Sequence, residues 1–279
     1  MKTMRSFLVL FVSLAFAAGL SAQTLTGFGV IKTNGVTQTV NGTSTLSGTA
    51  ISAYVFGSSS SLSGTYTFTP PAGGTVTTPQ TLTGNSSSVN FDAGYADVTT
   101  LNNAYANGIY SMALPNSLTP TSWSFTQPLM GNAYPNAPLV TGTWSGGLLQ
   151  VDPTQNYTLT FAPFGGFLVN GTHGDSISLS IEDSGFSQVH SDFSNVSVNT
   201  FLITAGTLTA GQTYNVSLRF NNNYIDYGAI GSANGSVSYT TENSFQIQAI
   251  PEPSTYAAIL GVVALGGVMI RRRRLLRAS

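Results

Sequence analysis

The side chains that could bind a metal or act as acids, bases or nucleophiles are few in this sequence and far apart. The two histidines are His173, in an Asn-Gly-Thr-His-Gly-Asp segment, and His190, two residues before Asp192. Neither falls within a metal-binding pattern such as His-Glu-x-x-His. Two histidines could still join carboxylates at a metal, but their spacing does not bring them together. We therefore expect both histidines in exposed loops and predict no metal site.

The segment Gly174-Asp175-Ser176 resembles the nucleophile block of the GDSL-type esterases. That family resemblance would imply an α/β fold, with the block near the N-terminus and an Asp-x-x-His block late in the chain. Here the segment His190-Ser191-Asp192 has the reverse order and lies too close, and the helical patterns of an α/β fold are missing. We predict instead that Asp175 and Ser176 begin a strand after a turn.

The carboxylates are too sparse to define a catalytic pair. Glu182 and Asp183 are adjacent, and neighbouring residues on a strand point to opposite faces of a sheet. A glycosidase needs two carboxyl groups about 5–10 Å apart, which here must come from different strands. A Ca²⁺ site that adds Asp175 and Asp226 to this pair lacks the Asp-x-Asp-x-Asp-Gly spacing. We predict no catalytic residue, no cofactor and no enzymatic activity, with a glycan-active hydrolase as the alternative.

An amide- and tyrosine-rich run, Asn221 to Tyr227, follows one of the predicted strands. Asparagine clusters favour turns, so we expect a loop at one end of the fold. Two interpretations remain open for this loop. It is either a solvated turn or a recognition loop whose amides and aromatic rings suit sugars.

The charge pattern excludes nucleic acid as a partner. Charged residues make up only 7% of the 279 residues, against roughly 25% in ordinary soluble domains. Between residues 23 and 250 only Lys32 and Arg219 are basic, and against nine acidic residues they give a net charge of −7. Such a region has no basic surface for a phosphate backbone. Its polarity comes instead from Ser, Thr, Asn and Gln, which is common in exported β proteins.

The sequence contains no cysteine. This excludes disulfides, thiolate metal sites and a cysteine nucleophile. A region of more than 200 residues can fold on its hydrophobic core alone, as one large domain or two ordinary ones.

The N-terminal end has the pattern of a secretory signal peptide. Lys2 and Arg5 precede an apolar run from Phe7 to Ala18, and Ala22 offers a small residue to the peptidase. We predict a signal peptide at 1–22, cut after Ala22, with the secretion machinery and signal peptidase as partners. An uncleaved membrane anchor is the alternative, for which the apolar run is short.

The C-terminal end combines three features in a fixed order. A Pro-Glu-Pro tripeptide is followed by an apolar stretch from Tyr256 to Ile270 and then by a basic cluster. As a helix the stretch is about 22 Å long, against a hydrocarbon core of about 30 Å, so it predicts a short transmembrane-like helix. Arginines stay cytoplasmic, which places the preceding chain outside. The residues we single out are Pro251, Glu252 and Pro253 in the motif, Tyr256, Gly261, Gly266, Gly267 and Ile270 in the apolar stretch, and Arg271, Arg272, Arg273 and Arg274 in the cluster.

This arrangement resembles the PEP-CTERM sorting signal of Gram-negative bacteria over residues 251–274. The resemblance implies cleavage near the Pro-Glu-Pro motif by a membrane peptidase of the exosortase class. It also implies transient anchoring in the inner membrane, delivery to the cell surface or extracellular matrix, and association with exopolysaccharide. A plain single-span anchor is the alternative, and it leaves the same region outside.

The region between the two ends has the alternating apolar and polar pattern of an all-β fold. We expect two β-sandwich-like domains, at 23–130 and 139–249, with a linker at 131–138 and a sorting segment at 250–279. A single larger sandwich is the alternative. In the first half one short helix is expected at 97–107, with Asp97 as its cap and Gly108 as its end.

The second half shows a further local pattern. About seven strands are expected over roughly 110 residues, as in a two-sheet sandwich. Leu208, Gly211 and Tyr214 have the Leu-x-x-Gly-x-x-Tyr spacing of the tyrosine corner, which resembles fibronectin type III and immunoglobulin-like domains. The resemblance implies that the Tyr214 hydroxyl bonds to upstream backbone.

Taken together, the sequence features predict a non-enzymatic surface or matrix protein with a structural or adhesive role. A surface-displayed carbohydrate-binding module is the alternative.

Overall fold

The computed structural model describes residues 25–58, 62–115, 121–125, 133–230, 233–250, 261–266 and 268–269. The strands of these residues are β1 (Leu25–Val40), β2 (Thr43–Gly57), β3 (Tyr66–Thr69), β4 (Gln80–Gly84), β5 (Ser88–Tyr95), β6 (Ser111–Ala113), β7 (Ser122–Ser124), β8 (Val140–Thr141), β9 (Trp144–Ser145), β10 (Leu148–Val151), β11 (Tyr157–Phe161), β12 (Ser176–Glu182), β13 (Gln188–Ser194), β14 (Thr200–Ile203), β15 (Thr213–Ile230) and β16 (Ala233–Ala249).

The strands form two sheets, which confirms the predicted all-β class. The large sheet has the order β13-β12-β15-β16-β1-β2-β5-β4-β3-β6-β7, with β10 and β9 attached beside β16. The small sheet has the order β14-β11-β8. Short apolar and polar alternations produce both sheets, since each strand then offers one face to a core and one to water.

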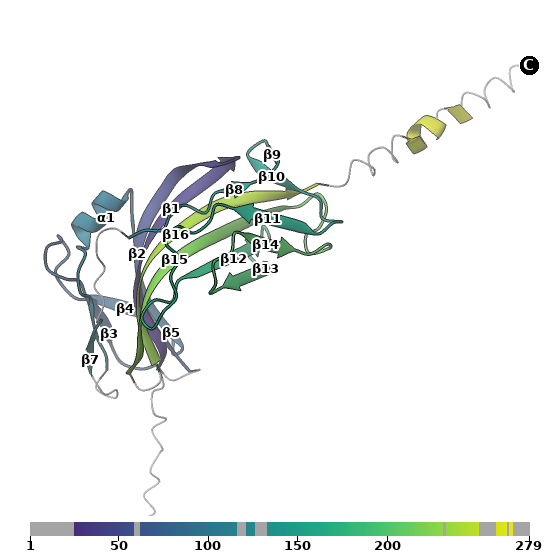
Figure 1. The fold of residues 1–279 in the computed structure, drawn as a ribbon. Helices are drawn as coiled ribbons and strands as arrows, with labels where there is room; N and C mark the ends of the chain where they lie inside the picture. Colours follow the sequence, from purple (N-terminus) through teal and green to yellow (C-terminus); the bar gives the residue numbers. More distant parts are fainter. Residues whose placement is uncertain are drawn as a thin grey trace, which may run out of the picture.

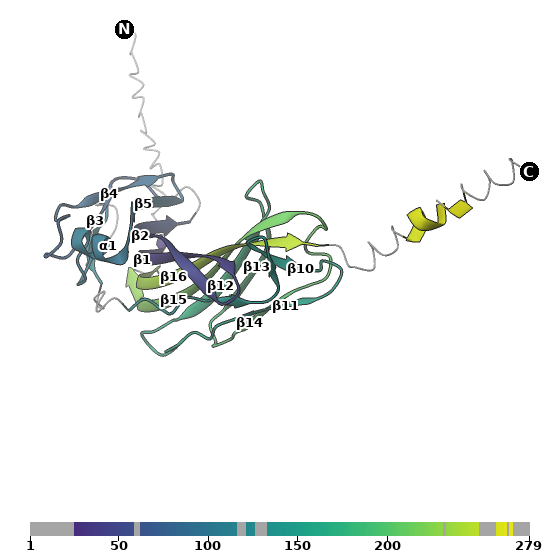
Figure 2. The ribbon, with the colours of Figure 1, turned by 90° about the horizontal axis from the view of Figure 1, so that it is seen from above.

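Four strands of 15 to 18 residues, β1, β2, β15 and β16, run through the whole length of the large sheet. Figures 1 and 2 show them passing from the part that carries α1 and β3 to the part that carries β11 and β13. At about 3.3 Å per residue such strands span roughly 50–60 Å. They are longer than the segments that the sequence predicted.

The predicted loop at Asn221–Tyr227 is wrong, because these residues lie within β15. Asparagine is disfavoured in strands when its amide has no partner. Here Asn223 Nδ2 donates to the Gly174 carbonyl at 2.9 Å and its Oδ1 accepts from Ser238 at 2.6 Å. Asn221 Oδ1 accepts from Thr240 at 2.9 Å. Cross-strand partners therefore hold the amides inside the sheet.

Parallel pairing of β1 with β16 joins the first strand of the chain to the last strand that the structure describes. Residues 27–37 of β1 pair in register with residues 234–244 of β16. On its other side β1 pairs antiparallel with β2, and β16 pairs antiparallel with β15. The two long hairpins thus become one sheet through the β1–β16 ladder.

Two separate hydrophobic cores lie along this sheet. The first collects residues from the first half together with the β15–β16 tip, including Ile230 and Val237. The second lies between the large and small sheets and includes Leu159 of β11, Leu179 of β12 and Leu218 of β15. The second half is therefore a two-sheet sandwich, and the tip of its central hairpin extends into the first core.

Residues 133–138 of the predicted linker lie across the sheet between these cores. Asn243 Nδ2 donates to the Pro138 carbonyl at 2.9 Å and to Gln38 Oε1 at 2.7 Å. The backbone N–H of Val140 donates to the same Gln38 oxygen at 2.8 Å. Buried amides need such partners. The division into two domains at 131–138 stays a prediction, while the large sheet runs past it without a break.

The predicted helix is present as α1 (Val98–Ala104), but it ends at the C-cap Tyr105 and not at Gly108. Asp97 is its N-cap, and the Asp97 carboxylate accepts from the backbone N–H of Thr100 at 2.7 Å. Hydrogen bonds from the backbone and the side chain of Thr100 lower the pKa of Asp97. Leu101 and Ala104 place the helix on the first core, as their spacing predicts.

The long ladder requires a glycine at position 29. A side chain there would place its Cβ 2.5 Å from the Ser236 carbonyl oxygen and 2.6 Å from the Tyr54 hydroxyl. That hydroxyl and Ser236 Oγ form a 2.8 Å hydrogen bond across β1. Gly27, two residues earlier, has its nearest such neighbour at 3.8 Å.

We predict that Gly29→Ala lowers the free energy of unfolding by about 1–3 kcal/mol, because the added methyl group overpacks the ladder. Gly27→Ala is the matched control and should change it by less than about 0.5 kcal/mol. Urea unfolding of the two variants measures both values. Equal stability of the two variants would contradict the close packing at β1–β16.

Candidate functional site

The candidate site is the outward face of the large sheet over β13, β12, β15, β16, β1 and β2. Leu179 and Leu218 point into the second core, so the residues that alternate with them face away from it. Strand register then fixes which outward side chains become neighbours. Two cross-strand rows result.

The first row consists of hydroxyl side chains alone, and we refer to it as the hydroxyl row. Register pairs its members successively from β13 to β2. The row contains Ser191, Ser180, Ser217, Ser244, Thr37 and Thr45. With neighbouring strands about 4.8 Å apart, six strands carry it over roughly 24 Å.

The second row runs beside the first and changes character along its length. It contains Phe193, Ser178, Arg219, Glu242, Gly35 and Gly48. Its two glycines have no side chain to fill the face, and they line a hollow of about 630 Å³ together with Glu242 and Ser244. The opposite end carries the only large aromatic side chain of the row.

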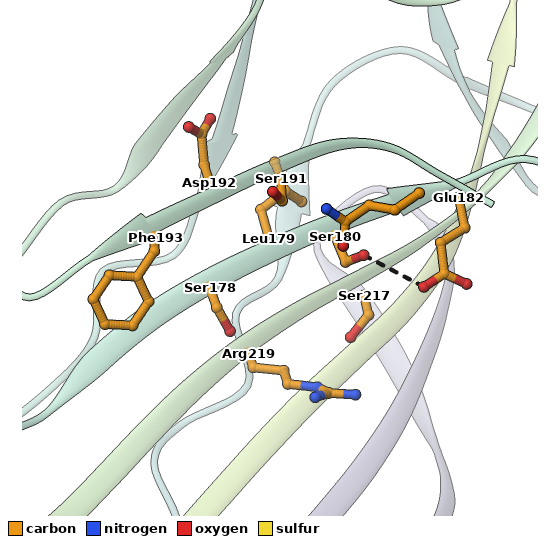
Figure 3. A pocket seen from close by; sticks show the side chains of 10 residues that line it. Ser178, Leu179, Ser180, Glu182, Ser191, Asp192, Phe193, Ser217 and Arg219 are labelled. Carbon is orange, nitrogen blue, oxygen red and sulfur yellow. Dashed lines mark hydrogen bonds between the residues drawn. The ribbon is translucent and has the colours of Figure 1, made fainter. Parts of the chain in front are cut away.

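Three neighbouring hollows lie along these rows and share lining residues, and we refer to them together as the sheet groove. A hollow of about 480 Å³ over β12, β13 and β15 is lined by Ser180, Glu182, Arg219 and Phe193, among others (Figure 3). A hollow of about 170 Å³ shares Ser180, Glu182 and Arg219 with it, and shares Glu242 with the 630 Å³ hollow. The lining residues of the three hollows together extend over the sheet from β13 to β2.

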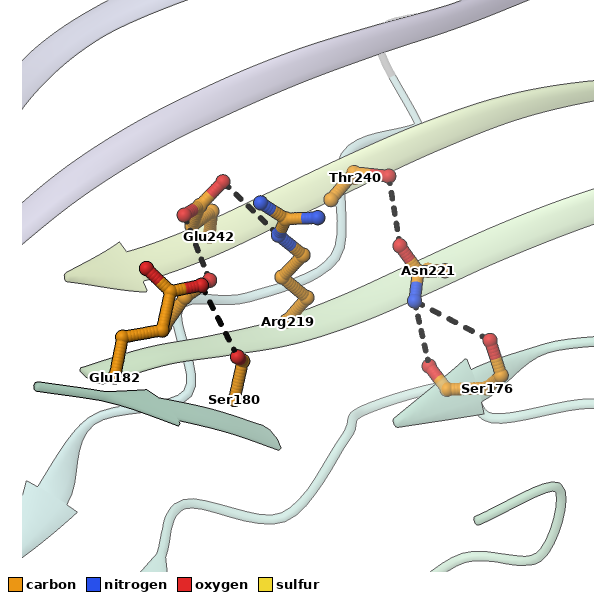
Figure 4. Close-up of polar contacts among 8 residues, drawn as sticks. Ser176, Ser180, Glu182, Arg219, Asn221, Thr240 and Glu242 are labelled. Atoms are coloured by element: carbon orange, nitrogen blue, oxygen red, sulfur yellow. Dashed lines mark hydrogen bonds and ion pairs between the residues drawn. The ribbon is translucent and has the colours of Figure 1, made fainter. Parts of the chain in front are cut away.

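The charges of the groove are arranged in pairs and hydrogen bonds (Figure 4). Arg219 Nε lies 3.0 Å from Glu242 Oε2, and Ser217 Oγ donates to Glu242 Oε1 at 2.7 Å. Ser180 Oγ lies 3.5 Å from Glu182 Oε1. The Arg219 side chain is 50% exposed, so solvent screens the pair, which contributes at most about 1 kcal/mol. The groove therefore presents many hydroxyls, the Arg219–Glu242 pair and the carboxylate of Glu182, which forms no ion pair among the described residues.

The adjacent carboxylates of the sequence have separate roles. Glu182 faces the groove, whereas Asp183 lies in the β12–β13 turn and accepts the backbone N–H groups of Gly185 and Ser187 at 2.8 and 2.9 Å. The second carboxylate of the groove is Glu242, which lines the 170 Å³ hollow with Glu182. Sequence reasoning missed this pair because the two residues are 60 positions apart and come to line one hollow only through the pairing of β12, β15 and β16.

Phe193 is the other groove residue that sequence reasoning missed. Its side chain is 68% exposed, at the β13 end of the groove. Alternation along β13 could have indicated it, because Phe193 shares its face with Ser191. A large exposed aromatic ring beside hydroxyls offers an apolar surface with polar groups around it.

The histidines lie apart, and the expectation of exposed loops is wrong for His190. His190 is on β13, where its Nε2 lies 3.1 Å from Asp192 Oδ2 and its side chain is only 17% exposed. His173 packs against the Tyr224 ring at a centroid distance of 4.5 Å. In the part of the chain that the structure describes, no three His, Asp or Glu side chains gather in a way that could hold a metal ion.

Asp175 and Ser176 have the structural role that the sequence predicted. Ser176 begins β12, and Asp175 is buried, where it accepts backbone N–H groups of Leu168 at 2.8 Å and Asn223 at 3.1 Å. Burial raises the pKa of this carboxyl. His190 pairs with Ile181, five residues along β12 from Ser176, or about 16 Å. The two do not form a nucleophile–base pair.

The tyrosine spacing is accompanied by a closed corner. The Tyr214 hydroxyl accepts the backbone N–H of Thr209 at 2.8 Å, five residues upstream. Gly211 has a φ of 82°, a left-handed conformation that glycine adopts without strain. Leu208 and Tyr214 are both buried in the second core. The corner thus fixes the entry of the chain into β15.

Most of the predicted sorting residues lie outside the described residues. This holds for Ala22, for Pro251, Glu252 and Pro253, for Tyr256, Gly267 and Ile270, and for Arg271, Arg272, Arg273 and Arg274. Gly261 and Gly266 are described, and they belong to a helical segment at 261–266. Within the described ranges no helix combines the length and apolar content needed to cross a membrane.

Fold and site together define an all-β protein with a long hydroxyl-lined groove on one sheet. Residues 249–274 match the PEP-CTERM protein-sorting motif. The chain is therefore an exported protein that is sorted through an exosortase, a membrane peptidase, as the C-terminal pattern predicted.

No curated protein sequence matches the chain. Among solved structures, the BSP domain of a biofilm associated protein is similar at 14% identity, with a TM-score of 0.21, over 82% of this chain and 30% of that one. The human OSCAR ligand-binding domain is similar at 14% identity, with a TM-score of 0.22, over 70% and 90%. The chicken CNTN1 FN1-FN3 domains are similar at 12% identity, with a TM-score of 0.21, over 81% and 66%.

We predict that Tyr214→Phe lowers the free energy of unfolding by about 1 kcal/mol, because the Thr209 N–H loses its acceptor while the ring still packs. Tyr227→Phe, at a side chain that is 61% exposed, is the control and should leave stability unchanged. Denaturant unfolding measures both. A Tyr214→Phe variant as stable as its control would show that the corner hydrogen bond is dispensable.

Proposed function

We propose that this protein is a non-enzymatic component of the cell surface or extracellular matrix, which binds a neutral polysaccharide along its sheet groove. Export begins with the signal peptide at 1–22. An exosortase-class peptidase then cleaves near Pro251-Glu252-Pro253, after transient anchoring through the apolar stretch at 256–270. The observation that carries the proposal is the sorting motif at 249–274 on a chain whose long sheet displays a hydroxyl row.

The chemistry of the groove suits a neutral sugar chain. Each serine or threonine hydroxyl can donate one hydrogen bond and accept two, which matches the hydroxyls of a polysaccharide. The Phe193 ring offers an apolar surface for the C–H face of a sugar. Arg219 and Glu242 largely neutralise each other, so the groove does not select for a polyanion. A groove across six strands suits an extended chain better than a small molecule.

A glycan-active hydrolase is the second candidate, and one observation favours it. Glu182 and Glu242 line the same 170 Å³ hollow, and glycosidases use two carboxyl groups from different parts of the chain. Glu242, however, is held by both Arg219 and Ser217. Release of reducing ends that disappears in Glu182→Gln would establish this candidate in place of the first.

The sorting part of the proposal is tested in the producing cell. We predict that replacing Pro251, Glu252 and Pro253 by alanine in the full chain moves the protein from the surface and matrix fraction to the membrane fraction. The tail should then remain attached, as intact-mass measurement would show. The double variant Ser254→Ala/Thr255→Ala, just outside the motif, is the control and should be sorted normally. Normal sorting of the triple variant, with the mass of a chain that has lost its tail, would refute cleavage that depends on the motif.

The binding part is tested with the mature protein and purified exopolysaccharide of the producing strain. We predict that Phe193→Ala weakens binding at least about fivefold, because the exposed ring is the main apolar contact of the groove. Phe186→Ala is the matched control, since Phe186 is 76% exposed but lies in the β12–β13 turn. Affinity should be nearly independent of salt, because a neutral glycan has no charge whose attraction to the groove salt could screen. Equal binding by both variants, or strong salt dependence, would argue against the groove as a neutral-glycan site.

A further inference from the structure

Lys32 is the one lysine in the described part of the chain, and its side chain is fully buried. It lies on β1 and points beneath α1. Its Nζ donates three hydrogen bonds, each 2.7 Å long, to Asn102 Oδ1, the Tyr105 carbonyl and Asn107 Oδ1. All three acceptors are neutral. Among the described residues, no Asp or Glu side chain forms an ion pair with this amine.

A buried ammonium without a counterion is costly, since neutral acceptors replace only part of its hydration. Burial accordingly lowers the pKa of Lys32 to about 8. At pH 7 roughly one amine in ten is then neutral, against fewer than one in a thousand for a solvated lysine. A desolvated lysine of this kind is a nucleophile. The question is which electrophile lies within its reach.

Asn107 is that electrophile. Its Oδ1 accepts from Lys32 Nζ at 2.7 Å and also from the Tyr239 hydroxyl at 2.8 Å. A C=O bond is about 1.2 Å long, so the Asn107 Cγ lies within about 3.9 Å of Nζ. Tyr239 is fully buried. Its O–H donor is therefore aimed, in a water-poor site, at the oxygen that would become negative if Nζ attacked Cγ.

We propose that Lys32 and Asn107 form an intramolecular amide bond in the folded protein. The lone pair of Nζ forms a bond to Asn107 Cγ, and charge develops on Oδ1, where the Tyr239 O–H stabilises it. The C=O double bond reforms as the Cγ–Nδ2 bond breaks. A proton passes from Nζ to Nδ2, and one molecule of ammonia leaves. The step is balanced without an oxidant, a reductant or a cofactor.

The geometry selects Asn107 over Asn102. Both amide oxygens lie 2.7 Å from Nζ, but it is Asn107 that accepts the Tyr239 hydroxyl hydrogen bond. The Tyr105 carbonyl and Asn102 hold the amine in place from the other two sides. Tyr239 belongs to β16, so the three reacting groups meet only after β1, β16 and α1 have assembled. The bond would then tie β1 to the segment after α1, across 75 positions, and would give a chain without cysteine a covalent cross-link.

Trypsin gives a direct test, because Lys32 is the single lysine or arginine between Arg5 and Arg219. The full chain is purified, denatured and digested, and its fragments are weighed. With the amide bond, cleavage after Lys32 fails, and the mass of the fragment that spans it is lower by one ammonia. Fragmentation should place the link between Lys32 and Asn107. Hydrogen bonds alone would not survive denaturation, so complete cleavage after Lys32 would overturn the proposal.

Matched variants separate the amide from other modifications of Lys32. Asn107→Ala should restore complete cleavage after Lys32 and the unmodified mass, whereas Asn102→Ala should keep the block. Tyr239→Phe should accumulate the bond several-fold more slowly after synthesis, because the developing charge on Oδ1 loses its donor. A block that persists in Asn107→Ala would overturn the assignment. Should Asn107→Ala fail to fold, the linked fragment of the unaltered chain still decides, since its presence or absence needs no variant.

Discussion

The parallel pairing of β1 with β16 is the constraint on which the rest of this structure depends. Residues 27–37 and 234–244 are about 200 positions apart in the chain, yet they form the central ladder of the large sheet. Ser244 meets Thr37, and Glu242 meets Gly35, across this one ladder. Without it the sheet groove would be two unrelated surfaces, and Tyr239 would not lie near Lys32.

One sheet serves two cores because its long strands change environment along their length. β16 contributes Val237 to the first core and Phe245 to the second. Between them, Thr241 and Asn243 hydrogen-bond to the backbone of the crossing segment at Pro135 and Pro138. These hydrogen bonds offset part of the desolvation cost of the polar crossing, while the buried Asn243 Oδ1 and Tyr134 hydroxyl have no hydrogen-bond partner among the described residues. The outward face stays hydrated through hydroxyls, which suits a protein that works outside the cell with few charges.

Local features of the sequence predicted local features of the structure. Asp97 and Leu101 predicted α1. The alternation around Leu179 and Leu218 predicted β12 and the first part of β15. The sorting motif could be recognised for the same reason, because it is defined by the order of residues along the chain and needs no tertiary contact.

Features that arise from pairing could not be predicted in this way. Asn221 to Tyr227 has turn-forming composition, and it is a strand because it pairs with β16 and because its amides bond to partners such as Ser238, Thr240 and the Gly174 carbonyl. The groove has no linear signature, because its rows take one residue from each of six strands. Register between distant strands decides which side chains share a row, and register is set by the whole sheet.

Native-state hydrogen exchange measures most directly whether the large sheet is one unit. We predict that backbone amides of Val30 to Val36 in β1 and of Val237 to Asn243 in β16 open together with those of Val216 to Phe220 in β15. All should show the free energy of global unfolding as denaturant is raised. Exchange of the β1 amides at a markedly lower free energy, while β15 and β16 stay protected, would contradict it. The two halves would then be independent units, and the groove across them would not be a fixed surface.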